Sequence, residues 1–577
     1  MGSKIFTCTN DRASSRYCPC LWATMILLGF SFASGGCHKY ESNAFVHGLK
    51  PIGARRSCLG NIQILPTSSL STAANTASSL SAVNSDEDVV IEKIPWLIVG
   101  GGIHGVHVSA RLIGSSVVSS AQDIRIIDSN SSLLRSWKVR TKSTGMKFLR
   151  SSGGYHLDLP EDSLRRFSLN GNTVDSKTAV GVINQKTKRK QRRKKHKISQ
   201  HQKRLSGHRV FSNDYERPRL DFFNDHCDSV VSKYGLEKIH TKGTVKNIEP
   251  SFDDDYVKVQ VLRKKADDPD VEVLIEYHAS NVVLALGNDR PSYPDWVDMD
   301  YDVIQHGFVR HLLDTDYGGF SRMGGIAVVG GGITAAHKAL ELISKSNGND
   351  ECPTGVDRNV PSTSRTVHVI ARHPLKEQQF DTHQEWMMDK AAAKRSEEGG
   401  GSGLPERQVT FQECDCYKMR RKIIAQERIP GTVTPAVHRG EDGLKYAIQK
   451  GDVQWHQAEI VDKAYVMRKD DGVDGEEVQQ LELTLSCGET IQVDQVLLGT
   501  GFGKKVPGGA LIQDLSRKLD VSEFCGYPIV DENLRWGNAG IYVTGALAEL
   551  ELGPSARNIA GARLAAERIV HAFNRAT

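Results

Sequence analysis

The stretch W-L-I-V-G-G-G-I-H-G-V-H-V-S-A-R-L-I, from Trp96 to Ile113, decides the fold of this chain. An apolar run leads into the pattern G-x-G-x-x-G, formed by Gly100, Gly102 and Gly105, and apolar residues at helical spacing follow it. The first glycine permits a tight turn, the second lets a pyrophosphate approach the backbone, and the third lets strand and helix pack closely. Because the free N–H groups of a helix N-terminus attract phosphate, this stretch predicts a dinucleotide-binding fold.

An acidic residue stands where such a fold needs one. A second apolar run, residues 124–127, ends at Asp128, about where a carboxylate accepts the ribose hydroxyls of the dinucleotide. A glycine-rich turn without a ligand is the alternative for the glycine pattern alone. The strand, the helix and the acid together favour cofactor binding.

The pattern recurs in the second half of the chain. An apolar run at 326–329 leads into G-x-G-x-x-A, formed by Gly330, Gly332 and Ala335, and an apolar helical stripe follows. This is the variant in which alanine replaces the third glycine. The sequence therefore predicts a second dinucleotide-binding fold.

The second fold differs from the first in the charge that follows its second strand. The strand expected at 366–370 ends without an acid, and Arg372 stands two residues further on. A guanidinium at this place suits the 2′-phosphate of NADPH, so we expect NADPH and not NADH. The alternative for Arg372 is a loop cation in solvent.

Two such folds in one chain predict a flavoenzyme in which the first fold holds FAD and the second delivers NADPH. The eleven cysteines include no C-x-x-C pair, so we expect neither a dithiol flavin reductase nor a metal site. Apolar runs at 282–287 and 496–502 end in glycine, and the second contains Thr500 and Gly501. Both resemble the strands at which flavoproteins with two dinucleotides cross between domains. We expect an α/β fold with two Rossmann-like dinucleotide-binding domains, the NADPH domain inserted in the FAD domain.

The charge of the chain is unevenly distributed. The formal charge is +5, yet residues 1–60 carry +5 and the run from Lys186 to Lys197 carries +9, which leaves −9 for the remainder. The basic run predicts a solvated loop, since nine like charges in twelve residues repel one another. Its rival interpretation, a nuclear-localisation or RNA-binding element, lacks interleaved aromatic residues for base stacking. We expect no specific nucleic-acid partner.

The first ninety residues predict a targeting sequence. Basic residues precede the uncharged run Leu21–Ala33, which has the length of a signal-peptide core and is too short to span a membrane. We assign residues 1–44 to a signal peptide and 45–92 to a transit-like disordered presequence without a membrane anchor after processing. The motif S-N-A-F at Ser42–Phe45 resembles the presequences of algae with complex plastids, which implies a plastid protein. The alternative is a secreted or endoplasmic-reticulum protein.

The chain has 577 residues, and the part that follows the presequence is long enough for the expected domains. We place the first part of the FAD-binding domain at 93–320, with a basic disordered insertion at 172–206. The NAD(P)-binding domain, with flexible insertions such as Glu397–Gly403, follows at 321–493, and the second part of the FAD-binding domain at 494–577.

A family resemblance adds to this interpretation. The stretch D-Q-V-L-L-G-T-G-F-G-K-K-V-P, residues 494–507, resembles the signature D-x3-[LF]-A-T-G-Y-x4-[HP] of the N-hydroxylating flavin monooxygenases, the lysine and ornithine hydroxylase group. It departs from the signature at Gly499, which replaces alanine, and at Phe502, which replaces tyrosine. Three further segments, 144–158, 216–223 and 542–563, are similar to a related branch of FAD/NAD(P)-binding proteins. The last of these contains the remaining expected cofactor-binding residues, Gly545, Gly553 and Pro554.

The resemblance implies a monooxygenase that uses NADPH and O2 to hydroxylate a small substrate, most simply the nitrogen of an amino acid or another amine. It also implies that the segment around Arg150 and His156 lies beside the flavin, although a salt bridge and a structural histidine explain these residues equally well. His104, within the first turn, is expected on the helix surface. Two alternatives stay open: an NADPH:acceptor oxidoreductase without oxygen insertion, and a non-catalytic flavoprotein that binds RNA or an acidic partner. The sequence assigns no catalytic residue.

Overall fold

The computed structural model describes residues 90–574 except 170–179, 183–215, 252–254, 266–267, 269, 289, 315–324, 347–365, 388–405, 441 and 470–476. The expected signal peptide, the presequence up to residue 89, the basic run Lys186–Lys197 and the loop Glu397–Gly403 lie outside the described residues.

The first sheet is built around the strand that contains Leu97 and Ile98, both fully buried. The strand order is β5-β2-β1-β8-β7-β6, and β21 pairs with β8. The strands are β1 (Val90–Val99), β2 (Ile124–Asp128), β5 (His240–Lys242), β6 (Thr244–Pro250), β7 (Val257–Lys264), β8 (Glu272–Leu284) and β21 (Ile541–Val543). The first half of β8 pairs antiparallel with β7, and its last three residues pair parallel with β21. The C-terminal region of the chain therefore completes a sheet that the N-terminal region begins.

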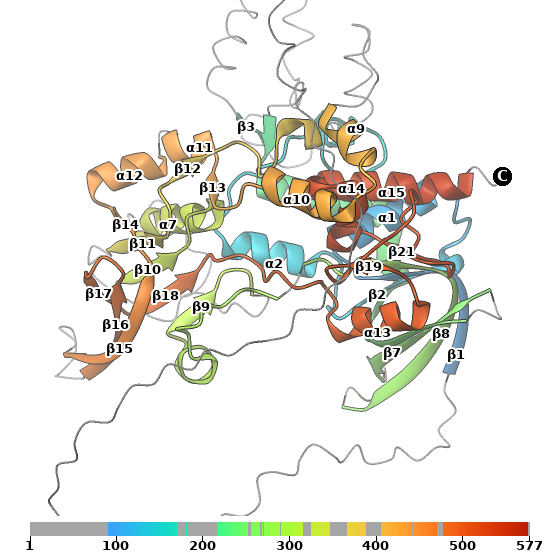
Figure 1. The fold of residues 1–577 in the computed structure, drawn as a ribbon, viewed down its shortest axis with the longest axis horizontal. Coiled ribbons are helices and arrows are strands. Elements are labelled where there is room, and N and C mark those ends of the chain that lie inside the picture. The colour runs from blue at the N-terminus through green and yellow to red at the C-terminus, as the bar shows by residue number, and fades with distance from the viewer. Residues whose placement is uncertain are drawn as a thin grey trace, which may run out of the picture. The chain divides into compact units, whose positions relative to one another are not determined.

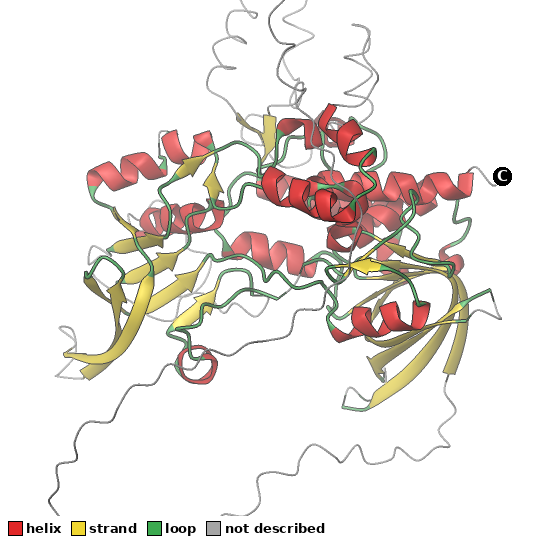
Figure 2. Ribbon diagram, viewed as in Figure 1, coloured by secondary structure: helices red, strands yellow, loops and turns green. Residues whose placement is uncertain are grey.

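Helices pack on this sheet and bury its apolar side chains (Figure 2). The helix after the first glycine turn contacts the last helix of the chain. A third helix, α13 (Ala510–Leu519), contacts β6. The first two helices are α1 (Ile103–Gly114) and α15 (Ile559–Asn574), with α6 (Leu220–Lys233) and α3 (Ser163–Leu169) on the α1 side. Short elements complete this region: η1 (Ala121–Asp123), α2 (Arg135–Ser143), η2 (Leu236–Ile239), β19 (Glu523–Phe524) and β20 (Tyr527–Pro528).

The second sheet is parallel throughout, with the order β14-β11-β10-β18-β9. Its strands are β9 (Val309–His311), β10 (Ile326–Val329), β11 (Val367–Ala371), β14 (Val453–Gln457) and β18 (Gln495–Leu498). One face packs on α7 (Ile333–Ser346), α11 (Pro435–Arg439) and α12 (Leu444–Lys450). The other face packs on an antiparallel sheet of β15 (Ile460–Lys469), β16 (Glu477–Leu485) and β17 (Thr490–Val493), next to η3 (Met299–Gln305). Parallel strands covered on both faces explain the uninterrupted apolar runs of β10 and β18.

The chain crosses between the two sheets twice, and the two crossings lie against each other. Pro291 and Phe502 form an antiparallel bridge, the Ser292 N–H donates to the Gly501 carbonyl over 2.9 Å, and the Gly503 N–H donates to the Arg290 carbonyl over 2.8 Å. The strand ends predicted at 282–287 and 496–502 are these crossings. Helix α2, between the two sheets in Figure 1, is tied to the loop after β9 by a 2.9 Å hydrogen bond from Arg140 Nε to the Leu313 carbonyl.

A set of short elements between β11 and β14 was foreseen only as flexible insertions. They are β12 (Lys376–Glu377), η4 (Gln384–Met387), α9 (Glu406–Gln412), α10 (Tyr417–Glu427) and β13 (Thr432–Val433). Helix α10 packs on the C-terminal segment of η5 (Gly545–Ala548), α14 (Glu549–Leu552) and η6 (Pro554–Arg557). This part of the region is therefore structured, and it contacts the C-terminal segment that packs beside the first sheet.

Two sequence-based boundaries need correction. Strand β1 begins at Val90, three residues inside the segment 45–92 assigned to the presequence, because residues 90–92 pair with residues 275–277 of β8. Within the insertion 172–206, expected to be disordered, β3 (Val180–Val182) pairs antiparallel with β4 (Glu216–Pro218). Backbone pairing with a distant strand is invisible in the local composition from which both boundaries were drawn.

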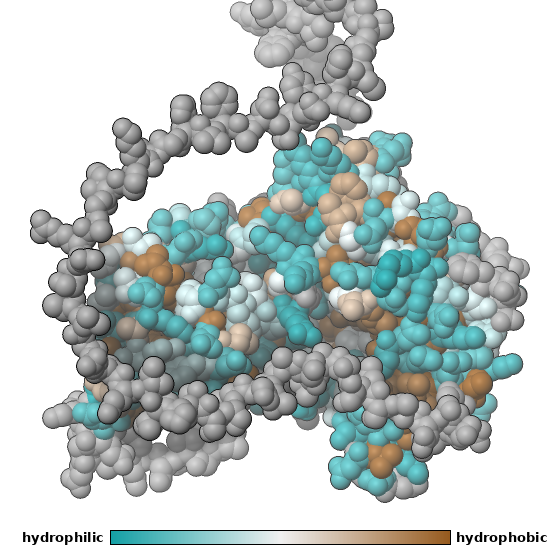
Figure 3. Space-filling model, turned by 60° about the horizontal axis from the view of Figure 1, so that its bottom comes forward, coloured by the Kyte–Doolittle hydropathy of each residue, from teal (hydrophilic) through white to brown (hydrophobic). Residues whose placement is uncertain are grey.

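Hydrophilic residues cover most of the described surface on the face shown in Figure 3, and apolar ones form small separate patches. Among the helices of the described residues, none combines the length and the apolar character that a membrane crossing requires.

Candidate cofactor and active site

A cavity of about 640 Å³ opens at the carboxyl end of the first sheet. Its wall includes the first glycine turn (99–104), the end of β2 (127–130), the segments 144–151 and 243–245, the first crossing (285–288) and residues 545–546 and 557–559. Thr334, in the first turn of α7, brings the wall to the second glycine turn. Crevices at the carboxyl ends of parallel strands are where α/β sheets bind ligands.

The three glycines of the first turn differ in how closely other atoms approach them. A Cβ atom on Gly100 would lie 2.3 Å from the Ala285 carbonyl oxygen, and one on Gly105 would lie 1.8 Å from that of Gly100. A Cβ atom on Gly102, which lines the cavity, would meet nothing within 4 Å. The first and third glycines are therefore required by packing, whereas Gly102 keeps open a space beside the N-terminus of α1.

Asp128 lies on the cavity wall at the end of β2, as expected for the acid of a dinucleotide fold. Its Oδ2 accepts the Gly101 N–H over 2.5 Å, and its Oδ1 accepts the main-chain and side-chain N–H groups of Asn130 over 2.7 Å each. These bonds fix the carboxylate before any ligand binds. Because each carboxylate oxygen has two lone pairs, acceptor capacity remains for hydroxyl groups of a ribose.

The second turn differs from the first mainly at its middle glycine. Gly330 has φ +145°, and a Cβ atom there would lie 2.6 Å from the Gly499 carbonyl oxygen. A Cβ atom on Gly332 would lie 3.3 Å from the Cα atom of Gly431, in the loop before β13. Whereas Gly102 faces open space, Gly332 faces the backbone of another segment.

The departure of Gly499 from the family signature has a physical explanation in this turn. A Cβ atom on Gly499 would lie 3.3 Å from the Cβ atom of Ala335, the third residue of the G-x-G-x-x-A pattern. The same Cβ atom would lie 3.3 Å from the Ala335 N atom and from the Val329 carbonyl oxygen. Glycine at 499 therefore leaves room for the Ala335 methyl group and for the backbone around it.

The expected cofactor residues Arg372, Thr500 and Gly501 do not line the cavity. Arg372 follows β11, its side chain is 72% exposed, and its Nε lies 3.9 Å from Glu459 Oε1. The Thr500 hydroxyl donates to the Ser292 carbonyl over 2.5 Å and contacts His311 Nε2 at 3.1 Å, which ties the two crossings together. Gly501 has φ +83° and sits in the same crossing. The next residue, Phe502, does line the cavity, and the Arg140 guanidinium lies 5.2 Å from its ring centroid.

The C-terminal segment contributes to the cavity, but only in part through the residues that the sequence singled out. Gly545, with φ +67°, lines the wall. Gly553 instead packs against Trp386, and the Pro554 carbonyl accepts Arg428 Nε over 3.2 Å. Arg557 and Asn558, which follow them in the chain, line the cavity.

A buried carboxylate holds Arg557 in place. Glu549, whose side chain is fully buried, accepts Arg557 Nε over 2.8 Å and Arg428 Nη2 over 2.9 Å, and it also pairs with Arg421. Burial by itself raises the pKa of Glu549, but the charges of Arg428 and Arg557 lower it more, so the group is a carboxylate. Helix α10, through Arg421, and the loop after it, through Arg428, are thereby attached to the segment that borders the cavity.

Basic residues dominate the charged part of the cavity wall. Four guanidinium groups line it, against the single carboxylate of Asp128: Arg135, Arg140, Arg150 and Arg557. Sequence analysis singled out only Arg150, because the others carry no motif and come from separate elements. A wall of this charge attracts anionic ligands such as the phosphates of a dinucleotide.

His104 is buried at the cavity, not exposed on the surface of α1 as the sequence suggested. It is 8% exposed, and its Nδ1 lies 2.5 Å from the Thr544 hydroxyl. Burial lowers the pKa of His104 to about 4, against the opposing effect of the nearby Arg557 carbonyl, so the ring is neutral at pH 7. The Nε2 atom is buried without a hydrogen-bond partner in the described part of the chain.

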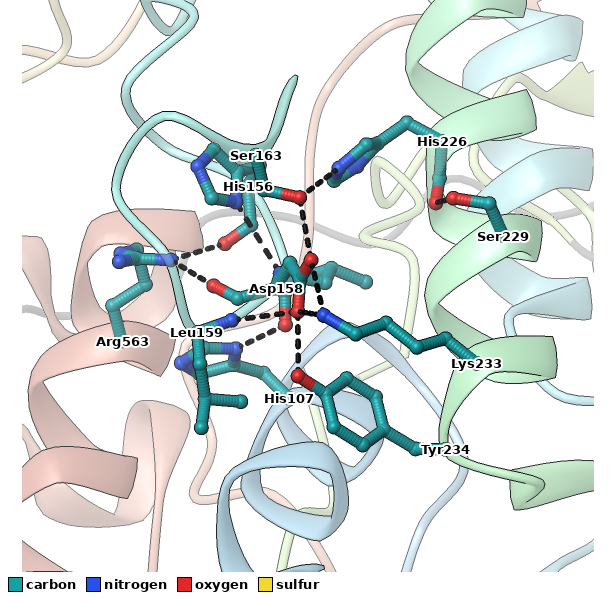
Figure 4. A network of polar contacts seen from close by, with 11 residues as sticks. His107, His156, Asp158, Leu159, Ser163, His226, Ser229, Lys233, Tyr234 and Arg563 are labelled. Atoms are coloured by element: carbon teal, nitrogen blue, oxygen red, sulfur yellow. Dashed lines mark hydrogen bonds and ion pairs between the residues drawn. The ribbon is translucent and has the colours of Figure 1, made fainter. Parts of the chain in front are cut away.

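His156 does not line the cavity, unlike Arg150 of the same segment. It belongs to a polar network behind α1 that centres on the buried Asp158 (Figure 4). Asp158 accepts Tyr234 OH over 2.7 Å, Lys233 Nζ over 3.0 Å and the Ser163 hydroxyl over 2.5 Å. The network joins the segment 156–163 to α6, so a structural role fits His156.

Solved structures resemble this fold at low sequence identity. No protein-family model and no curated protein matches the sequence. The ornithine hydroxylase PvdA of Pseudomonas aeruginosa matches with a TM-score of 0.53 at 16% identity, over 84% of this chain and 99% of that one. The cadaverine monooxygenase DfoA of Erwinia amylovora, solved with FAD, gives 0.51 at 14%, over 83% and 94%. The L-lysine 6-monooxygenase of Pseudomonas syringae gives 0.50 at 16%, over 84% and 100%. The chain shares the fold of these flavin monooxygenases.

Proposed function

We propose that this protein is an FAD-dependent monooxygenase that uses NADPH and O2 to hydroxylate the nitrogen of a small amine, such as an amino acid. One observation carries the proposal: the cavity begins at the open space beside Gly102, passes Asp128, and reaches Arg557 and the second glycine turn. The fold shared with N-hydroxylating enzymes supports the choice of reaction. Two dinucleotide-binding domains, the NADPH domain inserted in the FAD domain, account for the two sheets and the paired crossings.

The residues of the cavity fit FAD. The space beside Gly102 and the N-terminus of α1 would receive the pyrophosphate, and Asp128 would accept the ribose hydroxyls. Arg557 and the neutral His104 lie further along the wall, where donors stabilise negative charge on a reduced ring. Bound FAD would accept two electrons from NADPH and activate O2.

The reaction balances without any group from outside the proposal. The amine, O2, NADPH and one proton yield the hydroxylamine, NADP+ and water. One oxygen atom forms the new N–O bond, and the other leaves as water with the two electrons of NADPH. The protein binds and orients the reactants and excludes water from the cavity.

The test measures how oxygen is used. The purified protein should be yellow, lose its flavin absorbance under anaerobic NADPH and regain it in air. With a panel of amines that includes ornithine, lysine and cadaverine, we expect NADPH consumption to be matched by hydroxylated product. If every amine leaves hydrogen peroxide as the only oxygen product, the protein is an NADPH oxidase or an acceptor oxidoreductase. Failure to bind FAD would contradict both enzyme functions.

A further inference from the structure

A buried guanidinium that has no counterion among the described residues lies on β4. Arg217 is 5% exposed, and its Nε and Nη1 atoms are buried without a hydrogen-bond partner in the described part of the chain. The Phe148 ring lies 5.5 Å from its guanidinium carbon and provides only a cation–π contact. Burial lowers the pKa of Arg217 to about 10, so the side chain still carries its charge at neutral pH.

Other buried polar atoms near Arg217 also lack partners. His337, on α7, is 6% exposed, and its Nδ1 has no hydrogen-bond partner among the described residues. Burial, together with the charges of Arg217 and Arg150, lowers the pKa of His337 to about 3. The side-chain amide of Gln379 is likewise buried without a partner, and the main-chain carbonyl of the same residue accepts Arg150 Nε over 2.8 Å.

The second guanidinium of this cluster has only neutral partners. Arg150 donates to the carbonyls of Gln378 and Gln379 and, over 2.8 Å, to the Thr432 hydroxyl. Neither Arg150 nor Arg217 forms an ion pair with a carboxylate of the described residues. Burial lowers the pKa of Arg150, and the charge of Asp381 offsets only part of this effect. Two desolvated cations therefore face one region without a contacting anion. An unpaired buried charge is costly, and proteins keep one where a ligand neutralises it.

We propose that Arg217, His337 and Gln379 form a binding site for an oxyanion, a carboxylate or a phosphate, carried by a molecule that occupies the adjoining cavity. Arg150 connects this site to the cavity wall, and α7 connects it to the second glycine turn. Arg217 provides the charge and N–H donors. Neutral His337 and the Gln379 amide, whose buried atoms lack partners among the described residues, would provide further donors. The proposal rests on the proposed function only for the identity of the molecule that carries the oxyanion. That molecule is either the amine substrate or the nicotinamide nucleotide.

The first test uses the sign of a stability change. Arg217→Met removes the charge and keeps most of the side-chain volume. Because Nε and Nη1 have no hydrogen bond to the described residues and only the cation–π contact with Phe148 is lost, we expect the melting temperature without nicotinamide nucleotide or substrate to stay about the same or rise. Arg219→Met, two residues further along, is the matched control, since Arg219 is paired with Asp221. A fall in melting temperature for Arg217→Met larger than that of the control would show a structural partner and overturn the proposal.

The second test measures anion binding without turnover, so its outcome is independent of the monooxygenase proposal. At constant ionic strength, inorganic phosphate and acetate should raise the melting temperature of the wild-type holoprotein. Arg217→Met should weaken this effect at least tenfold in concentration, and Arg217→Lys should restore part of it. An unchanged anion response in Arg217→Met would overturn the proposal.

Two further measurements distinguish the sources. If the nucleotide supplies the anion, Arg217→Met weakens NADP+ binding at least tenfold and leaves the KM of the amine unchanged. If the substrate supplies it, NADP+ binding is unchanged, and the variant no longer distinguishes a carboxylate-bearing amine such as ornithine from its decarboxylated counterpart. If both properties match those of the wild type, no cavity ligand uses the site and the proposal fails.

Discussion

At the scale of single residues, the first glycine turn separates stability from binding. Gly102 and Gly105 stand three residues apart, yet only Gly105 is constrained by packing. A Cβ atom on Gly105 would lie 1.8 Å from the Gly100 carbonyl oxygen. The φ of Gly102 is −80°, which any residue adopts, and the space beside it is open. The fold therefore does not require glycine at position 102, and we expect the requirement to come from a ligand beside it.

This difference predicts opposite effects for two alanine substitutions. Gly105→Ala should destabilise the protein by more than about 3 kcal/mol or prevent folding, because the methyl group collides with backbone. Gly102→Ala should change stability by less than about 0.5 kcal/mol and weaken FAD binding at least tenfold, which is about 1.4 kcal/mol. Thermal unfolding of the apoprotein and the flavin content after purification measure the two effects. Normal flavin affinity in Gly102→Ala would remove the open space as the pyrophosphate site.

The contact between Ala335 and Gly499 predicts a compensating pair. Gly499→Ala places two methyl groups 3.3 Å apart, so we expect a loss of about 1 kcal/mol in the free energy of unfolding. Ala335→Gly in the same chain removes the opposing methyl group, and the two changes together should cost less than the sum of the single ones. Urea unfolding of the four proteins gives the coupling energy directly. Additive effects would mean that the signature departs at Gly499 for another reason.

At the scale of elements, the buried carboxylate of Glu549 is one of the groups that attach α10 to the C-terminal segment. Glu549→Gln leaves Arg421, Arg428 and Arg557 without their shared counterion, and removal of one partner from a buried ion pair costs about 3 to 5 kcal/mol. We expect a loss of this size, with faster amide exchange in α10. Asp514→Asn is the control, because its pairs with Arg517 and Lys518 are exposed and contribute about 1 kcal/mol or less. Equal effects of the two substitutions would contradict the anchoring role of Glu549.

The elements that the sequence predicted are those whose pattern is local. Strands β1, β2, β10 and β18 are short apolar runs beside glycine turns, and their positions follow from the residues themselves. Helix α10 has little apolar character, and its place is decided by arginines that meet Glu549 more than 120 residues later, a pairing that no local window contains. The same reason explains the candidate site. Gly102 and Asp128 carry a motif, whereas His104, Arg140 and Arg557 join the cavity only through the tertiary fold.

At the scale of the whole molecule, the protein buries several histidines in neutral form. Burial is the main cause that lowers their pKa, to about 3 or 4, and they lie in both sheet regions: His104, His156, His226, His311 and His337. Two of them, His156 and His226, belong to the network around Asp158 (Figure 4). In the unfolded chain each takes up a proton near pH 6.5.

The buried histidines predict that the protein unfolds in mild acid. Since the folded pKa values lie below the unfolded ones, the stability contribution is complete above pH 6.5 and is lost as the pH falls toward 4. Each group changes the free energy of unfolding by at most about 1.4 kcal/mol per pH unit, so five groups change it by up to about 7 kcal/mol per pH unit. Typical total free energies of unfolding are about 5 to 15 kcal/mol. Carboxylates with a lowered pKa, such as Asp158, lose their contribution only below about pH 4. We expect a midpoint between about pH 4.5 and 5.5 by circular dichroism, moved to lower pH in His226→Gln. A melting temperature that stays constant from pH 7 to pH 5 would show that these histidines are protonated in the folded protein.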